Sequence, residues 1–153
     1  MSKRIAALTA NIVGAGTVTN ARELDAALEA GSEFIVSPGL TEPLGRAAVA
    51  AGVPFLPGIA NAGDIMRGLD LGLDRFKFFP AMAAGGLPAL KALAAPFGQC
   101  RFCPTGGISL ENAPEWLAFD PVLCVGGSWV VGKGAPDVAA ITAAAAEAAA
   151  LRQ

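Results

Sequence analysis

Short apolar runs recur at nearly even spacing along this chain, and this repeat restricts the fold more than any other feature. Six runs, each ending in Gly, Pro or Ser, begin at Asn11, Glu33, Val53, Arg75, Cys100 and Pro121, at intervals of 22, 20, 22, 25 and 21 residues. An Ala- and Leu-rich segment suited to a helix follows each run. The runs are too apolar to alternate, as is typical of strands buried on both faces. The sequence therefore predicts a parallel sheet with helical crossovers.

Two arrangements fit such units, an open doubly wound sheet and a (β/α) barrel. A length of 153 residues suggests one domain, over 1–153. We expect six strand–helix units in it, after a partial helix in the segment "SKRIAALTA" that begins at Ser2. At the chain's own spacing, eight units would need more residues than it has.

Helix starts are visible as capping patterns. Asn20 with Glu23, and Asn61 with Asp64, resemble capping boxes. Pro136 stands near the first position of a C-terminal helix.

The composition excludes several classes of function. The net charge is −2, from 11 basic and 13 acidic residues, with no basic run that would favour nucleic acid as a partner. No apolar stretch reaches the roughly 18 residues of a membrane span, and "MSKRIAAL" does not resemble a signal peptide. We therefore expect no membrane partner and a cytoplasmic protein.

The sequence has no histidine and no tyrosine. A Ser-His or Cys-His mechanism is thus excluded, and acid–base chemistry must come from carboxylates, lysine, cysteine or water. Cys100 and Cys103 form a C-x-x-C, which would suit a redox pair or half a metal site. In a strand, however, this odd offset points the two side chains to opposite faces, so we expect no metal and no cofactor.

Lys77 lies in the apolar run "DRFKFFPA", residues 74–81. In a strand it shares a face with Phe79, while Phe76 and Phe78 take the other face. If the two phenylalanines face the helices, Lys77 faces the interior near the end of its strand, where barrel folds keep active sites. Burial lowers the pKa of a lysine, and a neutral amine can form a Schiff base with a carbonyl. The alternative is a lysine that extends to the barrel mouth or pairs with a carboxylate.

Double glycines stand at the ends of the last two runs, in "CPTGGIS" at 103–109 and "CVGGSW" at 124–129. Such loops let backbone N–H groups approach an anion, and barrel enzymes often bind phosphate after their last two strands. Ordinary strand-to-helix turns are the alternative. "VGAGTVTN" at 13–20 is a weak match to a dinucleotide motif, because Thr19 replaces the third glycine. Thr17 is better interpreted as a hydroxyl at a strand end.

Taken together, "IVGAGTV", "IVSPGLTEP", "PFLPGI", "FKFFPA", "RFCPTGGIS" and "VLCVGGSW" resemble the KDPG/KHG aldolases, a class I aldolase family, from about Ile12 to Trp129. The resemblance implies a TIM-barrel-derived α/β fold. It also implies cleavage of 2-keto-3-deoxy-6-phosphogluconate (KDPG) to pyruvate and glyceraldehyde 3-phosphate, without cofactor or metal. Lys77 would be the Schiff-base lysine. The implied substrate-binding residues are Thr17, Phe79, Thr105, Gly106, Gly107, Gly127 and Ser128.

The resemblance also marks a departure. Family members carry two further strands and an E-x-T-x-R motif before "VGAGT", and none precedes Ile12 here. We therefore expect a shortened aldolase of weakened activity and a homo-oligomer that covers exposed strand edges. In such an aldolase the proton would move through water or through a substitute such as Glu42. The segment "TEPLGR" offers Glu42 and Arg46, which are alternatively a capping residue and a solvated helix face. A phosphate-binding scaffold without turnover, or a fragment that folds by assembly, is the alternative function.

Overall fold

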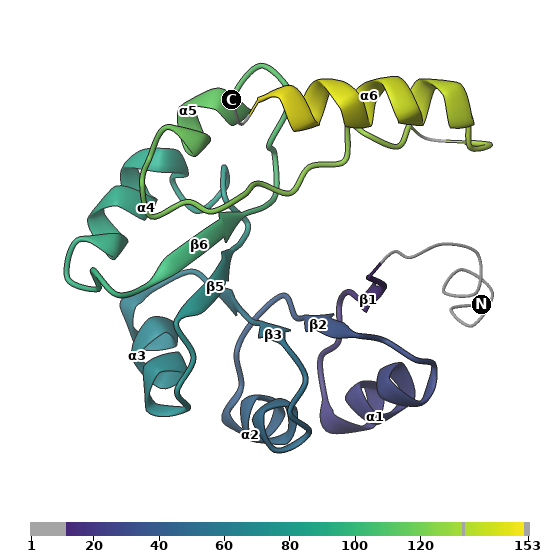
Figure 1. Ribbon diagram of the computed structural model, residues 1–153. Helices are drawn as coiled ribbons and strands as arrows, with labels where there is room; N and C mark the ends of the chain where they lie inside the picture. The colour runs from purple at the N-terminus through teal and green to yellow at the C-terminus, as the bar shows by residue number, and fades with distance from the viewer. Residues whose placement is uncertain (1–11, 133, 152–153) are drawn as a thin grey trace. The chain divides into compact units, whose positions relative to one another are not determined.

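The computed structural model describes residues 12–132 and 134–151, which form an α/β fold with parallel strand pairs and six helices (Figure 1). The partial helix predicted from Ser2 lies outside these residues. The chain divides into two compact units, Met1–Lys77 and Phe78–Gln153, and each is described by itself.

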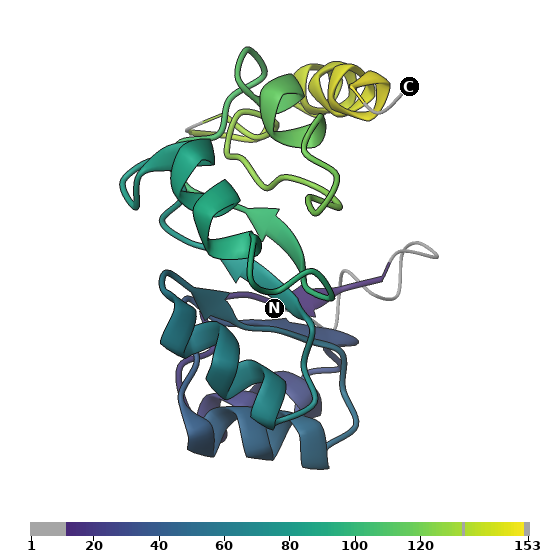
Figure 2. The same cartoon turned by 90° about the vertical axis from the view of Figure 1, so that its left-hand side faces the viewer.

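The first unit alternates strands and helices as predicted. Its elements are β1 (Gly14–Ala15), α1 (Ala21–Glu29), β2 (Phe34–Val36), α2 (Glu42–Ala50), β3 (Phe55–Leu56), β4 (Gly58–Ile59), α3 (Ala62–Asp70) and most of β5 (Arg75–Phe78). β1, β2 and β3 form a parallel sheet in that order, with α1 and α2 on the same face (Figures 1 and 2). The predicted third strand is divided at Pro57, which has no N–H to donate to a ladder.

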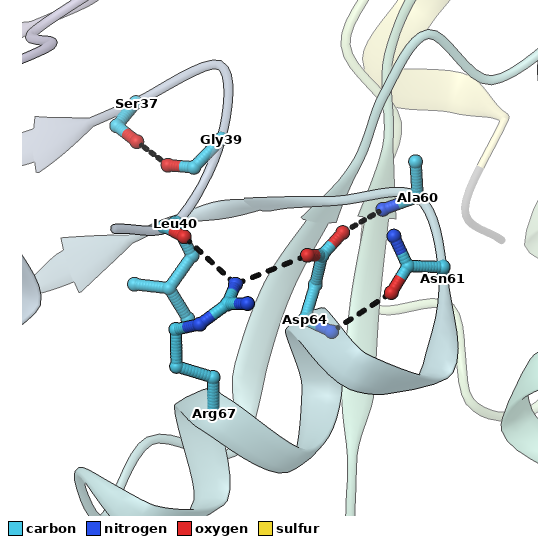
Figure 3. Close-up of polar contacts among 7 residues, drawn as sticks. All are labelled: Ser37, Gly39, Leu40, Ala60, Asn61, Asp64 and Arg67. Carbon is cyan, nitrogen blue, oxygen red and sulfur yellow. Dashed lines mark hydrogen bonds and ion pairs between the residues drawn. The ribbon is translucent and has the colours of Figure 1, made fainter. Parts of the chain in front are cut away.

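Both predicted capping patterns form, with one difference. The Asn20 and Asn61 side chains accept hydrogen bonds from the N–H groups of Glu23 and Asp64, each at 3.0 Å. The acidic side chains reach back one residue further than expected. Glu23 accepts from the Thr19 N–H at 2.7 Å, and Asp64 accepts from the Ala60 N–H at 2.9 Å, the second of which Figure 3 shows. At the starts of α1 and α3, these bonds satisfy one N–H group of the first helical turn. They also satisfy the N–H group of the residue before the capping asparagine, which fixes the conformation of the chain that enters the helix.

The second unit contains the end of β5, α4 (Gly86–Ala94), β6 (Arg101–Pro104), α5 (Ala113–Leu117) and α6 (Val138–Ala150). Its buried apolar residues come from all of these except α6, which buries none. As predicted, the C-terminal helix follows Pro136 closely, and the Asp137 side chain caps it by accepting from the Ala140 N–H at 3.1 Å.

The sixth predicted strand, from Pro121, forms only two isolated parallel bridges to the β6 segment. The bridges join Phe102 to Val122 and Thr105 to Gly126. From Phe102 to Thr105 is three residues, whereas from Val122 to Gly126 is four. The second segment thus has one extra residue between the bridges, and this residue interrupts the ladder as a bulge does.

Within the part of the chain that the structure describes, no helix is long and apolar enough to cross a membrane.

Candidate functional site

Lys77 lies in β5 between two fully buried phenylalanines and is itself half-buried. In the first unit, the Phe76 ring packs directly against Gly68 of α3. In the second unit, the Phe78 ring packs against Trp116 of α5, with centroids 6.3 Å apart. Both phenylalanines therefore face helices, and the alternation of the strand gives Lys77 the opposite face, as predicted. The Lys77 backbone N–H donates to the Pro57 carbonyl at 2.8 Å, which fixes the register of β5.

Thr17 lies just after β1, in the first unit, and is exposed. Its φ of 61° lies in the left-handed region. A β-branched residue rarely adopts this conformation, and such outliers are concentrated at ligand-binding sites. The backbone strain is thus an observation, independent of the sequence motif, that marks the end of β1.

Glu42 and Arg46 form an exposed ion pair along α2, with 2.7 Å between Arg46 Nη2 and Glu42 Oε1. Their i, i+4 spacing and exposure are those of a solvated helix face, the alternative given above. Nearby, the loop after β2 is held by Arg67 of α3. Its Nη1 donates to the Leu40 carbonyl at 3.0 Å and to Asp64 Oδ1 at 3.1 Å (Figure 3).

In the second unit, the turn Thr105–Gly107 follows β6 and uses all three of its carbonyl groups internally. Thr105 O accepts from the Ala81 N–H at 2.8 Å, and Gly106 O accepts from the Met82 N–H at 3.1 Å. Gly107 O accepts from Asn112 Nδ2 at 3.0 Å. Gly106 and Gly107 have φ values of 100° and 78°, which favour glycine and allow this geometry.

The second glycine loop lies directly beside this turn. A parallel bridge joins Thr105 to Gly126, and the Gly126 N–H donates to the Pro104 carbonyl at 3.0 Å. The position that a Cβ would take on Gly127 lies 2.9 Å from the Ile108 carbonyl oxygen. The structure therefore brings together the two loops that the sequence analysis singled out separately, with Gly107, Gly127 and Ser128 exposed.

The two loops have polar groups to offer a ligand. No residue in the described ranges accepts a hydrogen bond from the N–H of Gly106, Gly107, Gly127 or Ser128. The Thr105 hydroxyl is buried and has no hydrogen-bond partner within 12–132 and 134–151. Because the neighbouring carbonyls are occupied, the surplus polarity of this region is that of donors, which suits an anion.

Phe79 is brought to the same region of the second unit, since its Cδ2 lies 3.4 Å from the position that a Cβ would take on Gly106. Cys100 is buried, Cys103 is half-buried and Cys124 is exposed. Among the described residues, no group of three or more His, Cys, Asp or Glu side chains could hold a metal ion.

Comparison with known proteins identifies the family of this chain. The family model for KDPG and KHG aldolases matches residues 3–144. The chain belongs to this aldolase family. A 2-dehydro-3-deoxy-phosphogluconate aldolase of Zymomonas mobilis is 64% identical over 142 residues, which are 93% of this chain and 68% of that protein. The chain spans only 56% of the length of two further aldolases, from Dickeya dadantii and Escherichia coli.

Solved structures of the aldolase family agree. The crystal structure of the 2-keto-3-deoxy-6-phosphogluconate aldolase of Z. mobilis with 3-phosphoglycerate has 61% sequence identity and a TM-score of 0.97, covering 99% of this chain and 72% of that one. The KDPG aldolase of Legionella pneumophila, with pyruvate captured as a covalent carbinolamine intermediate, has 38% identity and a TM-score of 0.84. It covers 99% of this chain and 72% of that chain.

The sequence gives no indication of one residue that contacts the glycine loops. Asn112 precedes α5, where an asparagine is expected to cap the helix. Its side chain makes no cap hydrogen bond and contacts the Gly107–Ser109 segment instead. No signal in the sequence distinguishes these two uses of an asparagine.

Proposed function

We propose that this chain is a class I aldolase that cleaves KDPG to pyruvate and glyceraldehyde 3-phosphate through Lys77. The Lys77 amine attacks the C2 carbonyl of the substrate, and loss of water gives an imine. The C4 hydroxyl gives up its proton to a water molecule as the C3–C4 bond breaks, which releases glyceraldehyde 3-phosphate. The electron pair moves to the protonated imine and leaves an enamine. Protonation at C3 and hydrolysis by water then release pyruvate and restore the lysine.

The observation that carries this proposal is the half-buried position of Lys77 on the face of β5 opposite Phe76 and Phe78. A lysine on this face of the strand, opposite the side covered by helices, can present its amine to a substrate carbonyl. The covalent pyruvate intermediate of the Legionella aldolase supports imine chemistry in this family.

We further propose that the substrate-binding residues are those implied by the family motifs. The glycine loops, with Thr105, Gly106, Gly107, Gly127 and Ser128, would bind the phosphate and carboxylate of the substrate through the donors described above. The 3-phosphoglycerate in the Zymomonas structure supports a phosphorylated three-carbon ligand. The same motifs imply Thr17 and Phe79 as further substrate-binding residues.

A chemical trapping experiment tests the role of Lys77. The protein is incubated with pyruvate and borohydride, digested and weighed by mass spectrometry. We expect one reduced pyruvate adduct on Lys77, and none in Lys77→Arg, which keeps the charge but cannot form the imine. Lys91→Arg is the matched control, since Lys91 is exposed on α4, and it should trap pyruvate as the wild type does. An adduct on Lys91, or none at all, would contradict the mechanism; phosphate binding without an adduct would favour a scaffold.

We also propose that the chain acts as a cytoplasmic homo-oligomer and as a single barrel-derived domain of about six strand–helix units. The support for oligomers is exposed apolar surface in both units, including Met66, Val131 and Val138. The 13-residue helix α6, which is mostly alanine, also buries none of its residues in this chain. Light scattering at micromolar concentration tests this point, and a strict monomer would contradict it.

A further inference from the structure

We propose that Asn112 is a positioning residue that holds the Thr105–Gly107 turn in the conformation that binds the anionic group of the substrate. The inference rests on the proposed function, because it assumes that these loops bind phosphate. Asn112 touches no reacting atom in this proposal and acts only through the backbone of the turn.

The Asn112 side chain makes two hydrogen bonds to the backbone of the turn segment. Asn112 Nδ2 donates to the Gly107 carbonyl at 3.0 Å, and Asn112 Oδ1 accepts from the Ser109 N–H at 2.9 Å. These two partners fix the amide orientation, because the carbonyl needs a donor and the N–H needs an acceptor. The side chain therefore clamps the backbone on both sides of Ile108.

The Gly107 carbonyl is held differently from the other two carbonyls of the turn. The carbonyls of Thr105 and Gly106 are held by backbone N–H groups of Ala81 and Met82. The Gly107 carbonyl, by contrast, is held by a side chain, that of Asn112. A glycine at a φ of 78° has few steric restraints, so an unheld peptide could rotate. Rotation would exchange an N–H for a carbonyl oxygen at the loop, and that oxygen would repel an anion.

Asn112 is not placed to cap the helix that follows it. Its backbone angles are helical, with φ −96° and ψ −15°, whereas a capping residue is extended. The Ala113 N–H, at the start of α5, donates to the Ser109 carbonyl at 2.9 Å. The Asn112 side chain is therefore used for the turn and not for α5.

Two substitutions separate the contacts. Asn112→Ala removes both hydrogen bonds. Asn112→Asp keeps an acceptor for the Ser109 N–H but sets a carboxylate oxygen against the Gly107 carbonyl. Glu115→Gln, an exposed change on α5, is the control. Binding of inorganic phosphate is measured by calorimetry, and trapping of pyruvate by borohydride is measured on the same samples.

We expect Asn112→Ala to weaken phosphate binding by at least about fivefold, as loss of two ordinary hydrogen bonds predicts. Asn112→Asp should weaken it further, and Glu115→Gln should leave it unchanged. Pyruvate carries a carboxylate that the same turn is proposed to bind, so the trapping rate at Lys77 should also fall in both Asn112 variants and stay within about twofold in Glu115→Gln. An unchanged far-UV circular dichroism spectrum of each variant separates these losses from a general loss of folding. Unchanged phosphate affinity in Asn112→Ala would overturn the proposal.

A measurement on the wild type covers the case in which the variants do not fold. Phosphate is titrated into ¹⁵N-labelled protein, and the amide signals of Gly106 and Gly107 are followed by NMR. We expect both to shift at saturation while the Asn112 side-chain amide protons remain protected from exchange. Unmoved glycine signals, or a rapidly exchanging Asn112 amide, would overturn the proposal. Absence of pyruvate trapping alongside shifted glycine signals would instead count against the aldolase function and leave the positioning role supported.

Discussion

The rings of Phe78 and Trp116 lie with centroids 6.3 Å apart and planes inclined by 47°, and this contact joins the end of β5 to α5. Both side chains are almost fully buried. The contact directs Phe78 toward the helices of the second unit, so the preceding residue, Lys77, takes the opposite face of the strand. A packing interaction thus sets the orientation of the residue to which we assign the chemistry.

Trp116→Ala is therefore expected to destabilise the fold by about 3–5 kcal/mol, because it removes a large buried ring and leaves a cavity. Trp116→Phe, which keeps an aromatic ring, should cost less. Urea unfolding followed by circular dichroism measures both. Val131→Ala, at a half-exposed apolar site, is the control and should change the free energy of unfolding by less than about 0.5 kcal/mol. Equal effects at the two sites would refute the packing role.

Gly68→Ala tests the packing of Phe76 in the first unit. A Cβ on Gly68 would overlap the Phe76 ring, so we expect a loss of about 1–3 kcal/mol from overpacking, despite the better helix propensity of alanine. Gly63→Ala, in the same helix, is the matched control. Its Cβ would meet only Asn61 Oδ1, at 3.2 Å, and its effect should stay below about 1 kcal/mol. Thermal unfolding distinguishes the two, and a tolerated Gly68→Ala would show that Phe76 can move.

Glu23 should make the stability depend on pH. The Thr19 backbone N–H, followed by the Thr19 hydroxyl, lowers the pKa of Glu23 below its ordinary value of 4.5. A lowered folded-state pKa stabilises the fold above the unfolded-state value, and this contribution is lost as the pH falls through the folded-state pKa. Glu23→Gln should therefore destabilise the protein at neutral pH and have less effect in acid. Denaturant unfolding from neutral pH into acid measures the difference in free energy of unfolding between Glu23→Gln and the wild type. Glu29→Gln, at the other end of α1, is the control.

Gly107→Ala should weaken phosphate binding by more than about tenfold, since an alanine is strained at a φ of 78° and its Cβ would lie 2.7 Å from Met82 Cγ. Gly52→Ala is the matched control. Gly52 follows α2, has a φ of 66° and has open space around it. An alanine there causes a similar backbone strain, but at a position far along the chain from the loop. Calorimetry with inorganic phosphate should show weaker binding in Gly107→Ala alone. Equal affinities in the two variants would remove the loop from the phosphate site.

Much of the fold and part of the candidate site could be predicted from the sequence because they depend on local patterns. Even spacing of apolar runs predicted the strand–helix alternation, and the asparagine–acid pairs predicted the starts of α1 and α3. The alternation around Lys77 predicted its face. The predicted strand from Pro121 was reduced to two bridges, because one extra residue against β6 depends on register between distant segments.

The sequence by itself determined the family, the strand that carries Lys77 and the two glycine loops, since each of these is written in contiguous residues. Only the tertiary structure decided that the two loops are neighbours in the second unit and that their carbonyls are occupied while donors remain. It also decided that Asn112 serves the Gly107 turn and not its own helix. These properties depend on hydrogen bonds between segments that come together only in the folded chain. The sequence of one motif does not determine which partner each of its polar groups will bind.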